Sequence, residues 1–351
     1  MTRRRSDRRR DGFALPTVLT VTTILTLIFI VCLVALQDLT KQVRDAAADV
    51  DLQRQALSAE AEVAYFATTV PFSPLALKIG AERVSVASLM TTGAQSDSEK
   101  PWTPLPIDGT PLTWREQARS EAIGYQISLQ DEAGLINLDT AAPSAVAEVF
   151  TNAGLPADAA LKIAAEIRDY VSTDLAVSVT GVTPNAYAEA GLPSPLQRPA
   201  RTLSEIQGVL DWRGLMRQDV WRRAEPYLTT IPDSRTQNIN TAPAEVLHAL
   251  YGISTASAVG AVSRRAKAPL TDLADIGVAR GDDFTIFTFP DGRLRLRFVD
   301  PRTGSFYQST LVVTPGDLNR PIWIEDVRIQ HGLRPLANES VAPGLFPEIR
   351  N

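Results

Sequence analysis

The sequence predicts an α+β protein in which one long N-terminal helix packs on an antiparallel sheet, and in which a large all-helical segment interrupts the sheet domain. Three observations predict this class: a long uncharged run near the N-terminus, an internal repeat in the middle of the chain, and alternating apolar residues from residue 284 onward. With 351 residues, the chain is long enough for two or three domains.

The N-terminal run predicts a membrane anchor. No charged residue occurs from Gly12 to Gln37, and a helix of that length crosses a hydrocarbon layer of about 30 Å. A cleavable secretory signal has a shorter apolar region that ends in a small-residue cleavage site, which this run lacks. Six arginines among the first ten residues hold that end on the cytoplasmic side, so the rest of the chain is expected on the far side.

The helix is predicted to continue beyond the membrane as an amphipathic helix. Apolar residues recur there every seven positions: Leu36, Val43, Val50 and Leu57. No glycine or proline interrupts the chain between Pro16 and Pro71, so one helix of about 50 residues would reach about 75 Å. We expect its apolar stripe to pack on the sheet.

The middle of the chain contains an internal repeat. The segment NLDTAAPSAVAEVFTNAGLPADAALKIAAEIRDY (137–170) is similar to NINTAPAEVLHALYGISTASAVGAVSRRA (238–266). Both open with asparagine, an apolar residue, aspartate or asparagine, and Thr-Ala, and both continue as helix, glycine-containing turn and helix. Further on, Thr202 and Glu205 are spaced as a capping box at the start of a helix, and Thr271 or Asp272 is expected to cap the second copy.

Strands are predicted before and after this repeat. Residues 123–129 alternate as one half-buried strand, and four more segments follow the repeat: FTIFTF, RLRLRFV, SFYQSTLVVT and IWIEDVRIQ. In the second of these, Arg293, Arg295 and Arg297 lie on the face opposite the apolar residues. A row of arginines predicts a solvated face of the sheet.

The N-terminal residues carry a resemblance to a known family. A basic leader that ends in glycine, followed by Phe-Ala-Leu-Pro-Thr and the apolar helix, resembles the class III signal of type IV pilins and type II secretion pseudopilins. The resemblance implies cleavage between Gly12 and Phe13 by a prepilin peptidase, so that the apolar helix is retained. Most members carry a glutamate at the position of Thr17. Its absence, together with the order of repeats and strands, resembles the minor pseudopilin K family of type II secretion (general secretion pathway protein K).

The resemblance implies a pilin-like fold with two SAM-like or helix-hairpin-helix-like repeats. Its expected parts are a leader (1–12), a transmembrane part of the long helix (13–36), the first part of a pilin-like domain (37–135), an inserted α-helical domain (136–282, with repeats at 136–215 and 237–281), the pilin-like antiparallel strands (283–334) and a loose tail (335–351).

The function implied is that of a non-enzymatic minor pseudopilin at the tip of a periplasmic pseudopilus, which supports protein export across the outer membrane. The implied partners are the minor pseudopilins I, J and H, the prepilin peptidase, the secretion platform and the membrane itself. The chain would cross the bacterial inner membrane once, with its bulk in the periplasm. The alternatives are a minor pilin of a type IV or competence pilus, a membrane-anchored DNA-binding helix-hairpin-helix protein, and an unrelated protein with a plain signal anchor.

No motif for catalysis is present. The sequence lacks a Ser/His/Asp arrangement, a His-x-x-Glu-His motif and a phosphate-binding glycine-rich loop. We expect no nucleic acid partner, because the formal net charge is −5 and cations are few near the helix-hairpin-helix-like segment. That segment reads Gly252-Ile253-Ser254, without the second glycine of DNA-binding hairpins.

Calcium is the one cofactor that the resemblance raises. Family members often carry an Asp-Trp-x-Asp-x-Asp run after the second helix of the first repeat, and here the segment reads DYVSTD. Asp169 and Asp174 match, whereas Tyr170 and Ser172 replace the tryptophan and the middle aspartate. Calcium takes six to eight oxygen ligands, so the lost carboxylate is expected to weaken the site.

Overall fold

A computed structural model describes residues 14–70, 72–79, 103–114, 124–173, 184–232, 234, 236–278, 286–314, 317 and 319–330. The chain divides into two compact units, Met1–Arg54 and Gln55–Asn351. The predicted leader (1–12) and tail (335–351) lie outside the described residues.

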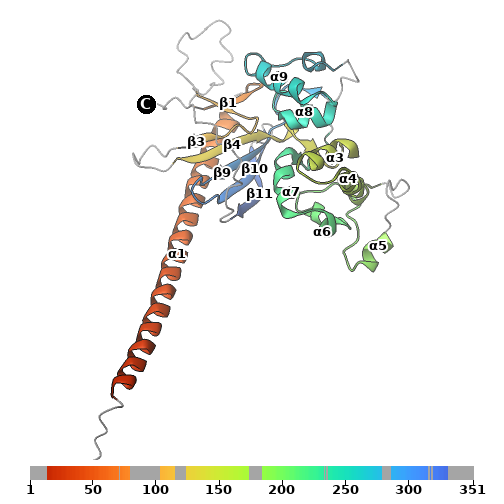
Figure 1. Ribbon diagram of the computed structural model, residues 1–351. Coiled ribbons are helices and arrows are strands. Elements are labelled where there is room, and N and C mark those ends of the chain that lie inside the picture. Colours follow the sequence, from red (N-terminus) through yellow and green to blue (C-terminus); the bar gives the residue numbers. More distant parts are fainter. Residues whose placement is uncertain are drawn as a thin grey trace, which may run out of the picture. The chain divides into compact units, whose positions relative to one another are not determined.

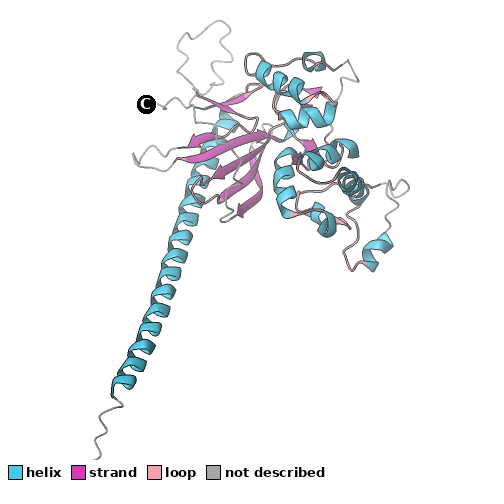
Figure 2. Ribbon diagram, viewed as in Figure 1, coloured by secondary structure: helices cyan, strands magenta, loops and turns pink. Residues whose placement is uncertain are grey.

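The described elements, drawn in Figures 1 and 2, combine one long helix, short helices and antiparallel strands. In chain order the helices and strands are α1 (Ala14–Thr69), β1 (Ala76–Ile79), β2 (Thr103–Pro106), β3 (Leu112–Trp114), β4 (Tyr125–Asp131), η1 (Glu132–Gly134), β5 (Ile136–Asn137), α3 (Pro143–Asn152), α4 (Ala157–Val171), α5 (Pro184–Glu189), η2 (Glu205–Gly208), α6 (Trp212–Leu215), α7 (Gln218–Ala224), η3 (Glu225–Tyr227), β6 (Leu228–Thr229), β7 (Gln237–Asn238), α8 (Ala244–Tyr251), α9 (Thr255–Arg265), η4 (Leu273–Ile276), β8 (Ile286–Phe287), β9 (Arg293–Val299), β10 (Phe306–Val313) and β11 (Ile322–Gln330).

The long helix and the antiparallel sheet are both confirmed. Five strands form the sheet in the order β11-β10-β9-β4-β3, and each neighbouring pair is antiparallel. The pairing of β4 with β9 places Ile127 opposite Phe298 and Leu129 opposite Leu296, and all four side chains are buried. Alternation of period two therefore selected the buried face of both strands correctly.

The predicted FTIFTF strand is wrong in its pairing. Its described part, β8, forms a two-residue parallel pair with β7. It is not part of the five-stranded sheet, in which β9 pairs with β10 and β4. The sheet instead gains β3 and β4, which precede the helical segment in the chain. Of the four strands predicted after the repeat, three thus belong to the five-stranded sheet. The sheet also contains strands that precede the helical segment in the chain.

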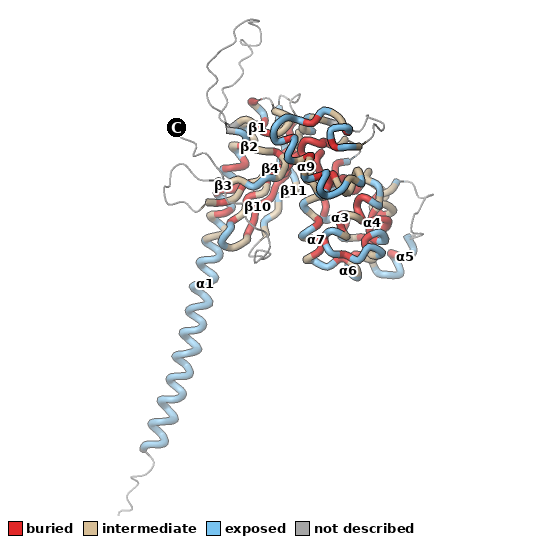
Figure 3. Tube along the Cα trace, turned by 45° about the horizontal axis from the view of Figure 1, so that its top comes forward, coloured by how far each residue is buried: buried red, intermediate tan, exposed pale blue. Residues whose placement is uncertain are grey.

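The C-terminal part of α1 packs through a face different from the predicted one. Within the second unit, Ala56, Ala59, Val63 and Ala67 are buried, whereas Leu57 is exposed. These buried positions follow the spacing of one helix face, and three of them are alanines, which let the helix approach the sheet closely. The prediction that the heptad leucines and valines form the face of α1 that packs on the sheet is therefore wrong in this part of the helix. Figure 3 shows the exposed, pale blue course of the rest of α1.

One buried carboxylate fixes α1 to β10. Glu60 is buried and accepts hydrogen bonds from the hydroxyls of Tyr307, at 2.7 Å, and Ser309. Burial and the hydrogen bond to Glu60 raise the pKa of Tyr307 above its ordinary value, so the phenol remains a donor at neutral pH.

Two helical hairpins form as the repeat predicts: α3 with α4, and α8 with α9. Gly154 (φ 96°) and Gly252 (φ 63°) occupy the turns, and their positive φ angles suit glycine because it has no Cβ. The buried residues of both hairpins form one continuous apolar cluster that extends from Ile136 to Ile276. The segment is not all-helical, however, because it also contains the two-residue strands β5, β6 and β7, of which β5 pairs with β6 and β7 pairs with β8.

The capping box predicted at Thr202 and Glu205 does not form, whereas the cap predicted at Thr271 or Asp272 is confirmed at Asp272. The Glu205 carboxylate accepts from the backbone N–H of Arg201, and the Thr202 hydroxyl bonds to that of Ser204, so the first copy has no such box. In the second copy, Asp272 and Asp275 cap η4 reciprocally. Arg198 also forms an ion pair with Glu205.

Candidate functional site

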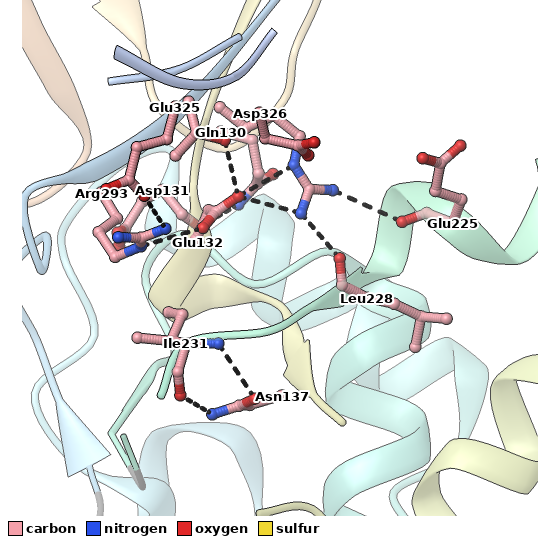
Figure 4. Close-up of polar contacts among 12 residues, drawn as sticks. Gln130, Asp131, Glu132, Asn137, Glu225, Leu228, Ile231, Arg293, Glu325 and Asp326 are labelled. Atoms are coloured by element: carbon pink, nitrogen blue, oxygen red, sulfur yellow. Dashed lines mark hydrogen bonds and ion pairs between the residues drawn. The ribbon is translucent and has the colours of Figure 1, made fainter. Parts of the chain in front are cut away.

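The candidate site is the junction at which β4 ends and the helical segment begins. Here η1 places the carboxylate of Glu132 against Arg295 of β9, with Oε1 3.2 Å from Nε and 3.1 Å from Nη2. Arg293 Nε and Thr310 Oγ1 lie 3.4 and 3.3 Å from the same carboxylate. Figure 4 shows Glu132 beside Arg293 at this junction. Both members of the central pair are buried, Glu132 with 4% and Arg295 with 8% of its surface exposed.

Arg295 also reaches η3 and β6, which follow the first helical repeat in the chain. Its Nη2 donates to the carbonyl oxygen of Leu228 at 2.8 Å, and its Nη1 donates to that of Glu225 at 3.5 Å. One guanidinium thus joins the sheet to Glu132, just before the first repeat, and to Glu225 and Leu228, after it. The prediction of a solvated arginine row is therefore wrong: the alternation placed the arginines on the correct face, but the helical segment covers that face.

The third arginine of the row confirms this correction. Arg297 is partly buried, and its guanidinium carbon lies 4.5 Å from the ring centroid of Phe306. A guanidinium over an aromatic face is a favourable contact. The row therefore faces protein groups along most of its length.

Asp131 is the second buried carboxylate of the junction. Its Oδ2 accepts from Asn238 Nδ2 at 2.8 Å and from Thr241 Oγ1 at 2.9 Å, and its Oδ1 accepts from the backbone N–H groups of Ala133 and Asp291. Burial raises its pKa to about 6, and these hydrogen bonds oppose the rise. Asp131 therefore ties the start of the second repeat to the end of β4.

The repeated Asn-x-Asn/Asp-Thr motif supplies equivalent anchors in both copies. In the first copy, Asn137 Nδ2 donates to the carbonyl oxygens of Ile231 and Ser234, both at 2.8 Å, and Thr140 Oγ1 donates to that of Ser234. The Asn137 contact with Ile231 is visible in Figure 4. In the second copy, Asn238 and the threonine three positions later bind Asp131. The asparagine and threonine of the motif thus bind the start of each repeat to a distant segment of the chain by hydrogen bonds.

A buried arginine connects the second hairpin to the loop after β2. Arg265 of α9 donates to the carbonyl oxygens of Ile239 and Ala242, and its Nη2 lies 3.2 Å from Asp108 Oδ2. Burial lowers its pKa, and Asp108 opposes that effect. Together with Asp131 and Glu132, this residue gives the helical segment three charged anchors on the sheet domain.

The predicted site residues are placed as follows. Gly12, Phe13 and Asp174 lie outside the described residues. Thr17 lies on α1 and is exposed, and Asp169 lies near the end of α4 and is partly exposed. The described part of the chain brings no three His, Cys, Asp or Glu side chains together as a metal site, so a calcium site built there would need further oxygens from outside it.

The function of this junction is mechanical connection. Each carboxylate is already bound to cations or hydrogen-bond donors of the protein, and breaking such buried contacts is costly. Asp131, Glu132 and Arg265 were not among the site residues predicted from the sequence. Two adjacent acids directly after an apolar strand, at a turn, were the signal that could have identified the first two.

Comparisons with known proteins point in one direction. Residues 127–233 match the family model described as type II secretion system (T2SS), protein K. The type II secretion system protein K of Pectobacterium carotovorum subsp. carotovorum is 30% identical over 155 residues, which are 43% of this chain and 46% of that protein. The chain thus matches a little under half the length of this curated relative.

A solved structure is also similar. A chain in the crystal structure of the GspK-GspI-GspJ complex from the enterotoxigenic Escherichia coli type 2 secretion system is 14% identical, with a TM-score of 0.49, and the match covers 82% of this chain and 99% of that one.

Proposed function

We propose, because residues 127–233 match the family model of the type II secretion system protein K, that the chain is a non-enzymatic minor pseudopilin of such a system. The observation that carries this proposal is the position of the family match. It includes β4, η1, the first helical hairpin and β6, which are the elements that join the sheet to the helical segment. The family match thus covers the region in which the helical segment is inserted into the sheet domain.

The long helix supports an anchored location. From Leu15 to Thr69, α1 is long and apolar enough to cross a membrane, with a mean hydropathy of 2.8 over its most apolar window. We place its first half in the bacterial inner membrane and the bulk of the chain in the periplasm. The arginine-rich N-terminus supports this orientation through the positive-inside rule.

The tip of a pseudopilus is the position that fits this chain. The helical segment from Ile136 to Ile276 is a bulky addition to the sheet domain and would hinder stacking of many identical subunits. The position that carries an acidic residue in most pseudopilins is Thr17, and in the family that acid is thought to pair with the N-terminal amine of a neighbour. A topmost subunit has no neighbour above it and does not need this pairing.

The remaining parts of the proposal concern processing and assembly. A prepilin peptidase would cleave between Gly12 and Phe13. The mature chain would then assemble with the minor pseudopilins I, J and H on the inner-membrane secretion platform. The two hairpins are proposed to be SAM-like or helix-hairpin-helix-like repeats, which is supported by their helix, glycine turn and helix order.

Calcium at Asp169 and Asp174 is a further proposal. Asp169 lies near the C-terminal end of α4, and Asp174 follows it by five positions in the sequence, so we propose that both carboxylates contribute to one site. Isothermal calorimetry of the full chain in detergent tests it: heat of binding that disappears in Asp169→Asn and Asp174→Asn supports the site. No heat above buffer at millimolar calcium contradicts it.

Co-purification tests the proposed function. The full chain, tagged and co-expressed with pseudopilins I and J of the same secretion system, is extracted in detergent and captured. Recovery of both partners in defined proportion is expected. Co-expression with the minor pilins of a type IV pilus is the control, because recovery of those proteins in place of I and J would favour the alternative of a pilus subunit.

A further inference from the structure

Strand β11 forms an open edge of the five-stranded sheet. It pairs with β10 on one side, and no described strand pairs with its other side. The strand has nine residues, and its large apolar side chains Trp323, Ile324 and Val327 are 42%, 49% and 53% exposed. The strand also carries Glu325, Asp326 and Arg328, and a register shift interrupts its pairing with β10. An open edge of nine residues is still long enough to pair with another chain.

A cleft lies at the C-terminal end of this strand. Its volume is about 510 Å³, and its apolar lining comes from Trp212, Met216 and Trp221 of the helical segment and from Phe306 and Ile329 of the sheet. Figure 1 shows β11 and α7 next to each other in this region. Clefts of roughly 300–1,000 Å³ with such linings hold small ligands or side chains of a bound segment.

The cleft is also lined by a guanidinium with one unpaired buried donor. Arg222 lines it, and its Nε is buried without a hydrogen-bond partner among the described residues. Buried donors are almost always paired. An acceptor, and a carboxylate best of all, therefore suits this position.

A second cation with an aromatic neighbour lies near the other end of the strand. The guanidinium carbon of Arg320 is 5.1 Å from the ring centroid of Trp323. A strand from Ile322 to Gln330 is about 30 Å long at about 3.3 Å per residue. An arginine thus lies near each end of the strand: Arg222 in the cleft and Arg320 beside Trp323.

The acids of β11 do not oppose a negatively charged ligand. Glu325 pairs with Arg293 at 3.1 Å, and Asp326 pairs with Arg328, which also binds Glu225. These pairs hold β11 in place and neutralise its carboxylates. Among the described residues, Arg222 and Arg320 have no such carboxylate partner.

We propose that this surface binds an extended segment of a partner protein. The segment adds to the open edge of β11 through backbone hydrogen bonds, places one apolar side chain in the cleft, and carries an acidic side chain near each end for Arg222 and Arg320. Strand addition of this kind takes affinity from the backbone and specificity from side-chain pockets. The inference goes beyond the proposed function and does not depend on it.

A designed peptide tests the proposal on the full chain in detergent. The probe is acetyl-Glu-Val-Thr-Val-Thr-Val-Phe-Glu-amide, which has acidic ends and an aromatic residue beside the second glutamate. Three of the five tryptophans of the chain, Trp212, Trp221 and Trp323, belong to this surface, so their emission reports binding. We expect a saturable change, with at least fivefold weaker binding to Arg222→Gln and unchanged binding to the exposed control Arg213→Gln.

Control peptides keep the test independent of any variant that fails to fold. The same peptide with glutamine in place of both glutamates should bind at least fivefold more weakly, and one with alternate prolines should not bind. The proposal is overturned if the acidic peptide gives no saturable change up to millimolar concentration, or if either control peptide binds equally well. It is also overturned if a chain that ends at Arg334 already differs in emission without peptide, because the chain's own C-terminal segment would then be the occupant.

Discussion

Replacing Arg295 with methionine is expected to lower the free energy of unfolding by about 3 kcal/mol, the lower end of the range for breaking a buried ion pair. The value follows from the burial of both partners and from what remains around Glu132. After the substitution, Glu132 keeps Arg293 and Thr310 as donors, at 3.4 and 3.3 Å. The carbonyl oxygen of Leu228, however, loses its charged donor at 2.8 Å.

Chemical unfolding of the full chain in detergent, followed by circular dichroism, measures the change. Hydrogen exchange adds a local readout: the amides of β5 and β6 should exchange faster, because Arg295 joins that end of the helical segment to the sheet, while α8 and α9 should change little. Arg213→Met is the matched control, since Arg213 is an exposed arginine of α6.

The explanation is refuted if Arg295→Met and Arg213→Met unfold at the same denaturant concentration. A second check uses Glu132→Gln alone and in combination with Arg295→Met. Because the two side chains are in contact, their effects should be non-additive by at least about 0.5 kcal/mol. Strictly additive effects would show that the pair does not connect the two parts.

Three further predictions concern the same unit. Glu60→Ala leaves two buried hydroxyls of β10 without their acceptor and should cost about 2–3 kcal/mol in urea unfolding; an unchanged midpoint would contradict the account of how α1 is held. Gly134→Ala should destabilise by about 1–3 kcal/mol, because a Cβ would lie 2.6 Å from Thr241 Oγ1, whereas Gly214→Ala meets nothing within 4 Å and should not. The folded-state pKa of Asp131, about 6, lies above its ordinary value of 3.8, so the folded state holds this proton more tightly. Its contribution to stability should therefore be complete below about pH 4 and fall by up to about 3 kcal/mol as the pH rises through 6. The free energy of unfolding, plotted against pH over pH 4–7, should have a different slope in wild type and in Asp131→Asn. Parallel plots for the two proteins would contradict the raised pKa of Asp131.

Local patterns predicted most of the elements. The uncharged run gave the long helix, and the repeat gave both hairpins, because helix periodicity and a glycine turn are local properties. The alternation in RLRLRFV assigned Leu294, Leu296 and Phe298 to one face, and all three are buried. These features depend on residues within a few positions of one another, so a single sequence contains them.

The contacts between distant segments could not be predicted in this way. Arg295 and Glu132 are 163 positions apart, and nothing near either residue shows that a helical segment covers the arginine face. The buried face of α1 was missed for a related reason: alanines carry a weak apolar signal, whereas the heptad leucines and valines carry a strong one. Close approach to a sheet favours the smaller residues, and that preference appears only when the partner surface is known.

The N-terminus of the mature protein tests the central claim most directly. The full chain is extracted from membranes, and its N-terminal peptide is identified by mass spectrometry. A pseudopilin should begin at Phe13 with a methylated amine, and a Gly12→Ala variant should remain unprocessed. A wild-type chain that still begins at Met1 or Thr2 in cells with an active prepilin peptidase would contradict the assignment of this protein to the pseudopilins.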